Sequence, residues 1–219
     1  MNPTQQSNGA SAYAGVTYKR PPRPLHFRES AKVPESRRHL EMRTFLYLVL
    51  QRAFGARGAI GSEQFVYFRA DDPKKCLAPD AFVRLGATNE HFATWKTWER
   101  GAPDVAVEVA SEFNRRWKQT LADYAEAGVR ELVWFDQDAN PGSRLRVWDR
   151  HEGDFVERVI EEDRTPSLVL GGTWFVAPSP VDPVSLRLLD AEGQLLLSPE
   201  EQALARVAEL ERELALARK

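Results

Sequence analysis

Two acidic residues stand at positions where the surrounding sequence is apolar. Glu108 lies within the run Val105–Ala110, and Asp80 follows Pro79 and precedes Ala81-Phe82-Val83. An ionised carboxylate inside a strand that is buried on both faces is costly unless a cation neutralises it. Two acids that converge on adjacent strands provide the ligands with which a hydrated divalent cation supports phosphodiester hydrolysis. The sequence therefore predicts that Asp80 and Glu108 share one metal ion.

The elements that follow Glu108 indicate a strand, helix, strand unit. An amphipathic helix is predicted from about Glu112 to Ala127, Gly128 is placed to end it, and Leu132–Phe135 forms a second apolar strand. Two apolar strands joined by a helix favour a parallel, right-handed crossover.

Before this unit, the pattern predicts one helix and two strands. Pro34-Glu35-Ser36 opens a helix that runs to Gly55, and strands are predicted at Gln64–Arg69 and Ala81–Arg84, with a turn at Asp71-Asp72-Pro73 between them. The apolar face of this helix is expected to consist of Leu40, Phe45, Leu48, Val49 and Phe54.

After the unit, the sequence predicts antiparallel hairpins and a terminal helix. Hairpin turns are expected around Arg150–Gly153 and Asp190–Gly193. Ser198, Pro199 and Glu201 are typical of a helix start with a capping box. The helix then carries an apolar seam of barely two heptads, so we expect it either to pack on the body or to pair with a second copy. The seam consists of Ala203, Val207, Leu210, Leu214 and Ala217.

Length and composition indicate one globular domain with tails. The chain has 219 residues and is 42% hydrophobic, which supports one core of ordinary size. Its single cysteine, Cys76, excludes an intrachain disulfide framework and is expected to be an inert small residue. No apolar run has the length of a signal peptide or a membrane span, so we expect a cytoplasmic protein without a membrane partner.

The charge is distributed unevenly along the chain. Residues 1–43 hold eight basic and three acidic residues, whereas the remainder holds 22 basic and 29 acidic ones. A basic arm on an acidic body could contact phosphates, or it could be a solvated tail. The first 30 residues are rich in Ser, Gln, Gly and Pro, which predicts a flexible arm.

An ordered series of motifs resembles one known family. The series contains A-P-D-A-F-V, then W-x-x-W-E-R-G-x-P-D-x-x-x-E-V-x-S, then a helix ending Y-A-E-A-G-V, then R-E-L-V-W-F-D. It resembles the putative restriction endonuclease family of the PD-(D/E)XK nuclease superfamily over roughly residues 35 to 195. The resemblance implies an α/β fold, with a restriction-endonuclease-like mixed sheet flanked by helices, distal antiparallel hairpins and a C-terminal helix. We therefore divide the chain into a flexible basic arm (1–30), a nuclease-like domain (31–197) and an amphipathic helix (198–219).

The resemblance also implies an activity. It is Mg²⁺- or Mn²⁺-dependent cleavage of DNA, with Asp80 and Glu108 as metal ligands and catalytic residues. A dimer would supply two sites for two strands. The alternative is a catalytically degenerate nuclease fold that binds nucleic acid or a protein partner.

The position of the catalytic lysine distinguishes these two functions. Ala110 replaces the usual strand lysine, and in the resembling family the lysine is typically on the next helix, four residues before its Tyr. That position is Thr120 here, counted back from Tyr124. Lys118 is the predicted catalytic lysine, although it lies about 200° around an ideal helix from Thr120.

Several residues have two interpretations. Arg115 and Arg116 could supply the positive charge, although arginine activates water poorly, or they could form a structural ion pair with Glu108. Asp80 could cap a turn, His39 matches a family histidine but could be structural, and Glu41 could reach the metal. We expect Asp104 and Asp136 to be loop residues. Four tryptophans are expected to be core anchors rather than base-stacking platforms: Trp95, Trp98, Trp117 and Trp134.

Overall fold

The structure is a computed structural model that describes residues 11–13, 16–18, 36–110 and 117–218. The predicted flexible arm lies outside the described residues, apart from strands β1 (Ser11–Tyr13) and β2 (Val16–Tyr18), which pair antiparallel. Among the described residues, no helix is both long and apolar enough to cross a membrane.

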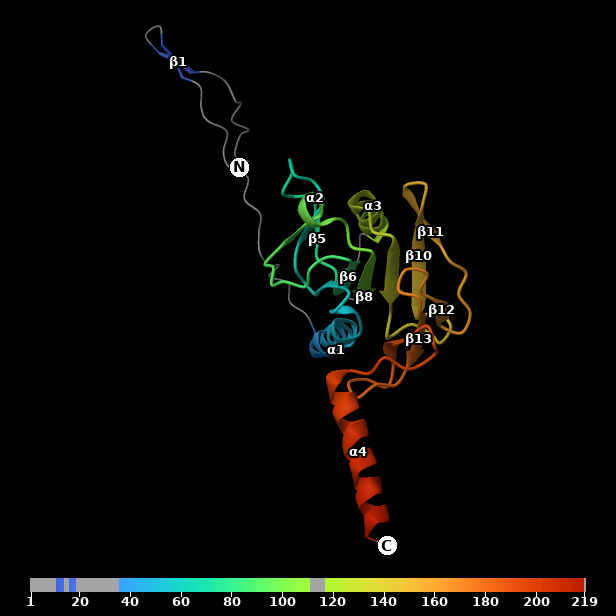
Figure 1. Cartoon of the computed structure of the whole chain (residues 1–219). Helices are drawn as coiled ribbons and strands as arrows, with labels where there is room; N and C mark the ends of the chain where they lie inside the picture. The colour runs from blue at the N-terminus through green and yellow to red at the C-terminus, as the bar shows by residue number, and fades with distance from the viewer. Residues whose placement is uncertain (1–10, 14–15, 19–35, 111–116, 219) are drawn as a thin grey trace.

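A six-stranded mixed sheet forms the centre of the protein (Figure 1). Only β8 and β9 pair in parallel among its neighbouring strands, as the strand, helix, strand pattern predicts. β6 pairs antiparallel with β8 on one side, and β10 pairs antiparallel with β9 on the other. In spatial order the strands are β11 (Asp154–Glu157), β10 (Leu145–His151), β9 (Glu131–Phe135), β8 (Val105–Val109), β6 (Ala81–Leu85) and β3 (Gly58–Gly61).

Helix α1 (Arg37–Phe54) covers one face of this sheet. Ser36 caps its N-terminus by accepting a hydrogen bond from the His39 N–H, as expected for a serine at this position. The helix buries Met42, Phe45, Leu46, Val49, Leu50 and Phe54. The predicted apolar face is therefore wrong at Leu40 and Leu48, which are 41% and 39% exposed, because the buried stripe is rotated toward Met42 and Leu46.

Helix α3 (Trp117–Ala127) packs against the opposite face of the sheet. Its Tyr124 and Ala127 contribute to a second hydrophobic cluster with Ala106 and Leu132. Gly128 follows with a φ of 86°, which favours glycine over other residues and ends the helix as predicted. The β8, α3, β9 unit thus places α3 directly beside the face of β8 that carries Ala106.

Two small sheets flank the centre. One consists of β5 (Cys76–Leu77), β4 (Val66–Tyr67) and β7 (Trp95–Lys96), so the strand predicted over 64–69 is reduced to two residues. The predicted turn at 71–73 is present, with Asp72 Oδ1 accepting from the Lys74 N–H. A short helix, α2 (Thr97–Arg100), follows β7.

The other small sheet comprises β12 (Arg164–Pro166), β13 (Thr173–Ala177) and β14 (Ser185–Leu189). It is joined to the central sheet through Glu131, which is fully buried. The Glu131 carboxylate accepts hydrogen bonds from Trp174 Nε1 at 2.9 Å and Ser167 Oγ at 2.7 Å. Arg158 Nη2 lies 2.9 Å from the same carboxylate and forms a salt bridge with it.

Both predicted hairpin turns and the terminal helix are present. β10 and β11 are joined through Glu152 and Gly153, which have φ values of 50° and 98°. The second turn joins β14 to Leu195 by an isolated bridge with Leu189. Helix α4 (Pro199–Ala217) begins with the predicted capping box and extends away from the body (Figure 1). A mixed sheet flanked by helices, with antiparallel hairpins and a C-terminal helix, is confirmed.

Candidate functional site

Asp80 and Glu108 lie at the same end of two neighbouring strands. β6 and β8 pair antiparallel, with Ala81 opposite Val107. One step further along this register places Asp80, which directly precedes β6, opposite Glu108. Successive side chains of a strand alternate between its faces, and Ala106, two residues before Glu108, packs in the cluster beside α3. Glu108 therefore points to the α3 side of the sheet.

The Asp80 carboxylate is almost completely buried and has two close contacts. Its Oδ2 accepts a hydrogen bond of 2.7 Å from the Val109 N–H, and the same oxygen lies 3.3 Å from His39 Nε2. Asp80 is 4% exposed. The Val109 N–H of β8 and the His39 side chain of α1 thus hold Asp80 in one orientation. His39 is thereby placed beside the predicted acidic pair.

The Glu108 carboxylate accepts a hydrogen bond from the Tyr124 hydroxyl. Burial, and after it the negative charge of Asp80, raise the pKa of Glu108 to about 8. The Tyr124 hydrogen bond and the nearby His39 oppose this rise. Without a bound cation, these surroundings favour the protonated form of Glu108.

Tyr124 is the contribution of α3 to this cluster. It is 1% exposed, and burial together with the Glu108 carboxylate raises its pKa well above the ordinary value, so it remains a hydrogen-bond donor at physiological pH. The sequence pattern does not predict this contact of Tyr124 with Glu108. The signal that could have identified it is its position on the helix after β8, where a buried hydroxyl needs a polar partner.

Glu63 lies near the pair and Arg43 lies near Glu63, and the sequence pattern predicts neither contact. The negative charge of Glu63 contributes to the raised pKa of Glu108. Glu63 has a positive φ of 66°, and its N–H donates to the Pro79 carbonyl at 2.9 Å, which holds the loop beside Asp80. Arg43 Nε lies 3.9 Å from Glu63 Oε1. Because Arg43 is four residues after His39, both side chains project from the same side of α1.

Lys118, the predicted catalytic lysine, is exposed in the first turn of α3. It lies six residues before Tyr124, about 120° away around an ideal helix. Thr120 lies only about 40° from Tyr124 on the same basis. Lys118 therefore leaves α3 in a different direction from the side chain that contacts Glu108. Arg115 and Arg116 lie outside the described residues.

Asp80 and Glu108 have the chemistry of a magnesium site with few protein ligands. No group of three or more His, Cys, Asp or Glu side chains within 36–110 and 117–218 is arranged to hold a metal ion. Mg²⁺ keeps several of its waters and is commonly bound through only one or two carboxylates. A cation would also relieve the repulsion between the two acids that raises the pKa of Glu108. The two residues thus fit a hydrated divalent cation.

Three other acidic residues weighed from the sequence have local structural contacts. Asp104 is buried and accepts from the Leu85 N–H at 2.8 Å. Asp136 accepts from the Asp138 N–H in a turn, and Glu41 pairs with Arg37 at 2.7 Å on the surface of α1. These contacts support the structural interpretation of all three residues.

The tryptophans follow the core prediction with one exception. Trp95 is fully buried, and Trp117 and Trp134 pack with ring centroids 4.1 Å apart. The prediction is wrong for Trp98, which is 42% exposed because α2 is a single turn on the surface.

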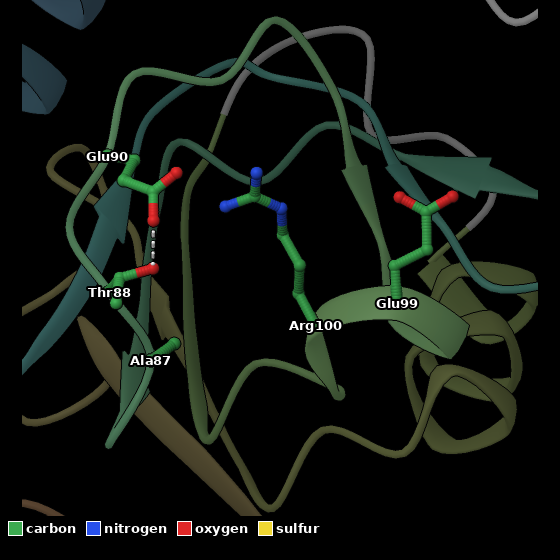
Figure 2. A pocket seen from close by; sticks show the side chains of 5 residues that line it. All are labelled: Ala87, Thr88, Glu90, Glu99 and Arg100. Atoms are coloured by element: carbon green, nitrogen blue, oxygen red, sulfur yellow. Dashed lines mark hydrogen bonds between the residues drawn. The ribbon is translucent and has the colours of Figure 1, made fainter.

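A cleft of about 470 Å³ lies at the other end of β6 (Figure 2). Arg100 points into it between the loop that carries Thr88 and Glu90 and the turn of α2 that carries Glu99. This cleft is separated from Asp80 by the length of β6, and its two acids contact other residues, Glu90 the Thr88 hydroxyl and Glu99 the Lys96 amine. We therefore place the candidate chemistry at Asp80 and Glu108 and not in the cleft.

Comparison with known proteins identifies the family. Residues 30–179 match the putative restriction endonuclease family, Uma2. The chain belongs to this family. No curated protein matches the sequence. Among solved structures, the crystal structure of a putative nuclease belonging to DUF820 from Anabaena variabilis ATCC 29413 is similar with a TM-score of 0.46 and 14% identity, over 81% of this chain and 85% of that chain. The resemblance to the putative restriction endonuclease family that the motifs indicate is thus confirmed.

Proposed function

We propose that this protein is a divalent-metal-dependent endonuclease that hydrolyses phosphodiester bonds of DNA. Membership of the putative restriction endonuclease family supports a nuclease. The observation that carries the proposal is the pairing of Asp80 with Glu108 on neighbouring strands, where burial and then the Asp80 charge raise the pKa of Glu108 to about 8. Such perturbed acids are common where a protein binds a cation or performs proton transfer.

Asp80 and Glu108 would hold Mg²⁺ or Mn²⁺. Each carboxylate directs one oxygen toward a protein group, Asp80 toward the Val109 N–H and Glu108 toward Tyr124. The second oxygen of each is the atom that would bind the cation. When bound, the cation would lower the pKa of a coordinated water and stabilise charge on the phosphate oxygens.

The surrounding residues hold these acids in place. Tyr124 orients the Glu108 carboxylate, and His39 lies against Asp80. Glu108 must lose its proton to bind a cation, so metal affinity should increase as the pH rises toward about 8. This dependence can be measured by isothermal titration calorimetry with Mn²⁺ between pH 6 and pH 9.

The test of cleavage uses the full chain and supercoiled plasmid DNA. We expect nicking with Mg²⁺ or Mn²⁺, none with EDTA, and at least about a hundredfold loss of rate in Asp80→Asn and Glu108→Gln. Glu90→Gln removes an acid from the cleft at the far end of β6 and serves as the matched control with unchanged cleavage. Cleavage that survives both Asp80→Asn and Glu108→Gln would overturn the proposal.

The role of Lys118 is tested separately. Lys118→Ala should lower the cleavage rate strongly at unchanged DNA affinity if this lysine acts in the reaction, with the exposed Lys74→Ala as control. Unchanged cleavage would move the cationic role to Arg115, Arg116 or Arg43.

A degenerate nuclease fold that binds DNA or a protein is the second candidate. It is favoured by Ala110 and Thr120 at the two positions where a lysine is expected, and by the exposed position of Lys118. Absence of both metal binding and cleavage of DNA or RNA by the unmodified protein would support it.

A further inference from the structure

Helix α4 carries apolar side chains that the body does not cover. Among the described residues Pro199–Ala217, none is buried. Val207, Leu210 and Leu214 are 52%, 45% and 51% exposed. The helix is about 28 Å long at 1.5 Å per residue and extends away from the body (Figure 1). An isolated helix of this length is only marginally stable in water, so a partner along its apolar side would stabilise it.

The body fixes the direction in which α4 leaves. Glu201 completes the capping box with Ser198, and its Oε1 accepts a hydrogen bond of 2.7 Å from Arg187 Nη2. Arg187 is 3% exposed, and its guanidinium lies 5.1 Å from the centre of the Phe45 ring of α1. The first turn of α4 is therefore held by a buried ion pair, and the rest of the helix is presented in a defined orientation.

The uncovered apolar residues follow a coiled-coil heptad. Their spacing alternates between four and three residues, which assigns Val207 and Leu214 to a positions and Leu210 to a d position. Ala203 and Ala217 occupy the d positions at either end. Two coiled helices would bury this seam against an identical seam.

The charged residues beside the seam are complementary to those of a second copy. In a parallel coiled coil, a g residue faces the e residue five positions later on the other helix. Arg206 at g would face Glu211 at e, and Glu213 at g would face Arg218 at e. The two g to e′ contacts that contain charged residues thus pair opposite charges, and symmetry repeats each of them.

The composition of α4 argues against other occupants. Residues 199–218 contain five glutamates and three arginines, so this surface is unfavourable for a nucleic acid or an anionic membrane. We propose that α4 pairs with α4 of a second copy of this chain as a short, parallel, in-register coiled coil. The pairing places both bodies at the same end of the coil. A seam of two heptads is short, so association should be weak and should depend on protein concentration.

Sedimentation equilibrium of the full chain tests the charge pattern. Arg206→Glu places two acids in both symmetry-related contacts between positions 206 and 211, and it should lower the association constant by about tenfold or more. Arg212→Glu makes the same charge change at an outward f position and should leave association unchanged. Arg206→Glu combined with Glu211→Arg restores opposite charges and should recover association. An equal effect of Arg206→Glu and Arg212→Glu, or a monomer at all concentrations up to 1 mM, would overturn the proposal.

Disulfide trapping tests the parallel register. In a Cys76→Ser background, Leu214→Cys puts one thiol at an a position of each helix, where the two meet only in a parallel, in-register pair. Oxidation should cross-link this variant, whereas Ala205→Cys at an f position should stay monomeric. Equal cross-linking of both variants, or none for Leu214→Cys, would overturn the proposed pairing. Neither measurement depends on nuclease activity.

Discussion

Two glutamates on adjacent parallel strands have opposite surroundings. Glu131, at the start of β9, is fully buried, and its carboxylate accepts from Arg158 Nη2 and the Leu168 N–H at 2.9 Å each. Ser167 and Trp174 donate to its other oxygen. A buried carboxylate with a paired guanidinium and further hydrogen bonds is compensated for its loss of water.

Glu108, near the end of β8, is placed beside another acid instead. Its neighbours include Asp80 and Glu63, both of which raise its pKa, and its hydrogen bond comes from the neutral Tyr124 hydroxyl. The comparison shows that burial alone does not identify a functional acid. What distinguishes Glu108 from Glu131 is the charge beside each carboxylate: Glu131 faces the Arg158 guanidinium, whereas Glu108 faces Asp80 and Glu63, with His39 opposing their effect on its pKa.

The largest effect is expected from Glu131→Ala. The substitution removes the acceptor of the Ser167 hydroxyl and the Trp174 indole and leaves Arg158 with Asp149 as its remaining carboxylate, so it should lower the free energy of unfolding by about 3–5 kcal/mol. Chemical denaturation monitored by circular dichroism measures this loss. Glu131→Gln keeps the side-chain volume, so a similar loss in that variant would attribute the effect to the charge and not to a cavity. A change below 1 kcal/mol in both variants would contradict the compensated role of Glu131.

Glu108→Gln should have the opposite effect on stability, and it should depend on pH. The folded-state pKa of about 8 exceeds the ordinary value of 4.5, so the folded chain retains a proton that the unfolded chain releases between these values. The free energy of unfolding of the unmodified protein should therefore fall as the pH rises from 4.5 through 8. Glutamine does not titrate, so the variant should gain stability relative to it as the pH rises, by at most about 5 kcal/mol above pH 8 and by little below pH 4.5. Denaturation in metal-free buffer measures this difference, and a difference that does not vary with pH would refute the raised pKa.

Tyr124→Phe should have a smaller effect, of about 1 kcal/mol on the free energy of unfolding. Because the Tyr124 hydrogen bond lowers the pKa of Glu108, its removal should move that pKa further upward. Carbon-detected NMR titration of the Glu108 carboxyl measures the shift. Tyr47→Phe removes a hydroxyl from α1 and should leave the titration unchanged; a downward shift in Tyr124→Phe would contradict the assignment.

The smallest effect is expected from Glu157→Gln, which provides the baseline for the other variants. Glu157 pairs with Arg146 at 2.7 Å on the surface, where both side chains are more than 40% exposed. Exposed ion pairs contribute little, so the free energy of unfolding should change by less than about 0.5 kcal/mol. A loss as large as that of Glu131→Ala would remove the distinction between buried and exposed pairs.

The sequence predicts the β8, α3, β9 unit and the start of α4 well, because the signals for these elements are local. The apolar run that contains Glu108, the Gly128 stop and the capping box at Ser198 each act within a few residues. β3 is not predicted, since Gly58 and Gly61 have low strand propensity. Its glycines are explained only by the fold: a Cβ on Gly61 would lie 2.1 Å from the Phe82 ring.

The residues around the predicted acids are harder to infer from sequence. Glu63 lies on a loop, has a positive φ and donates its N–H to the Pro79 carbonyl. Glu131 forms hydrogen bonds with residues far along the chain, such as Trp174. Neither arrangement has a periodic pattern. Asp80 and Glu108 are brought to neighbouring strands as predicted, whereas the catalytic role of Lys118 stays a prediction that its substitution will test.

The two ends of β6 differ in how much sequence change they can accept. Asp80, at the start of β6, accepts a hydrogen bond from the Val109 N–H, so its side chain continues the pairing of β6 with β8 beyond their main-chain ladder. The opposite end leads through Gly86 into the surface segment that forms the Arg100 cleft. Insertions in that segment would lengthen an exposed loop without shifting the strand register at Asp80. During divergence, the surface near Arg100 is therefore free to acquire new contacts while the acidic pair keeps its position.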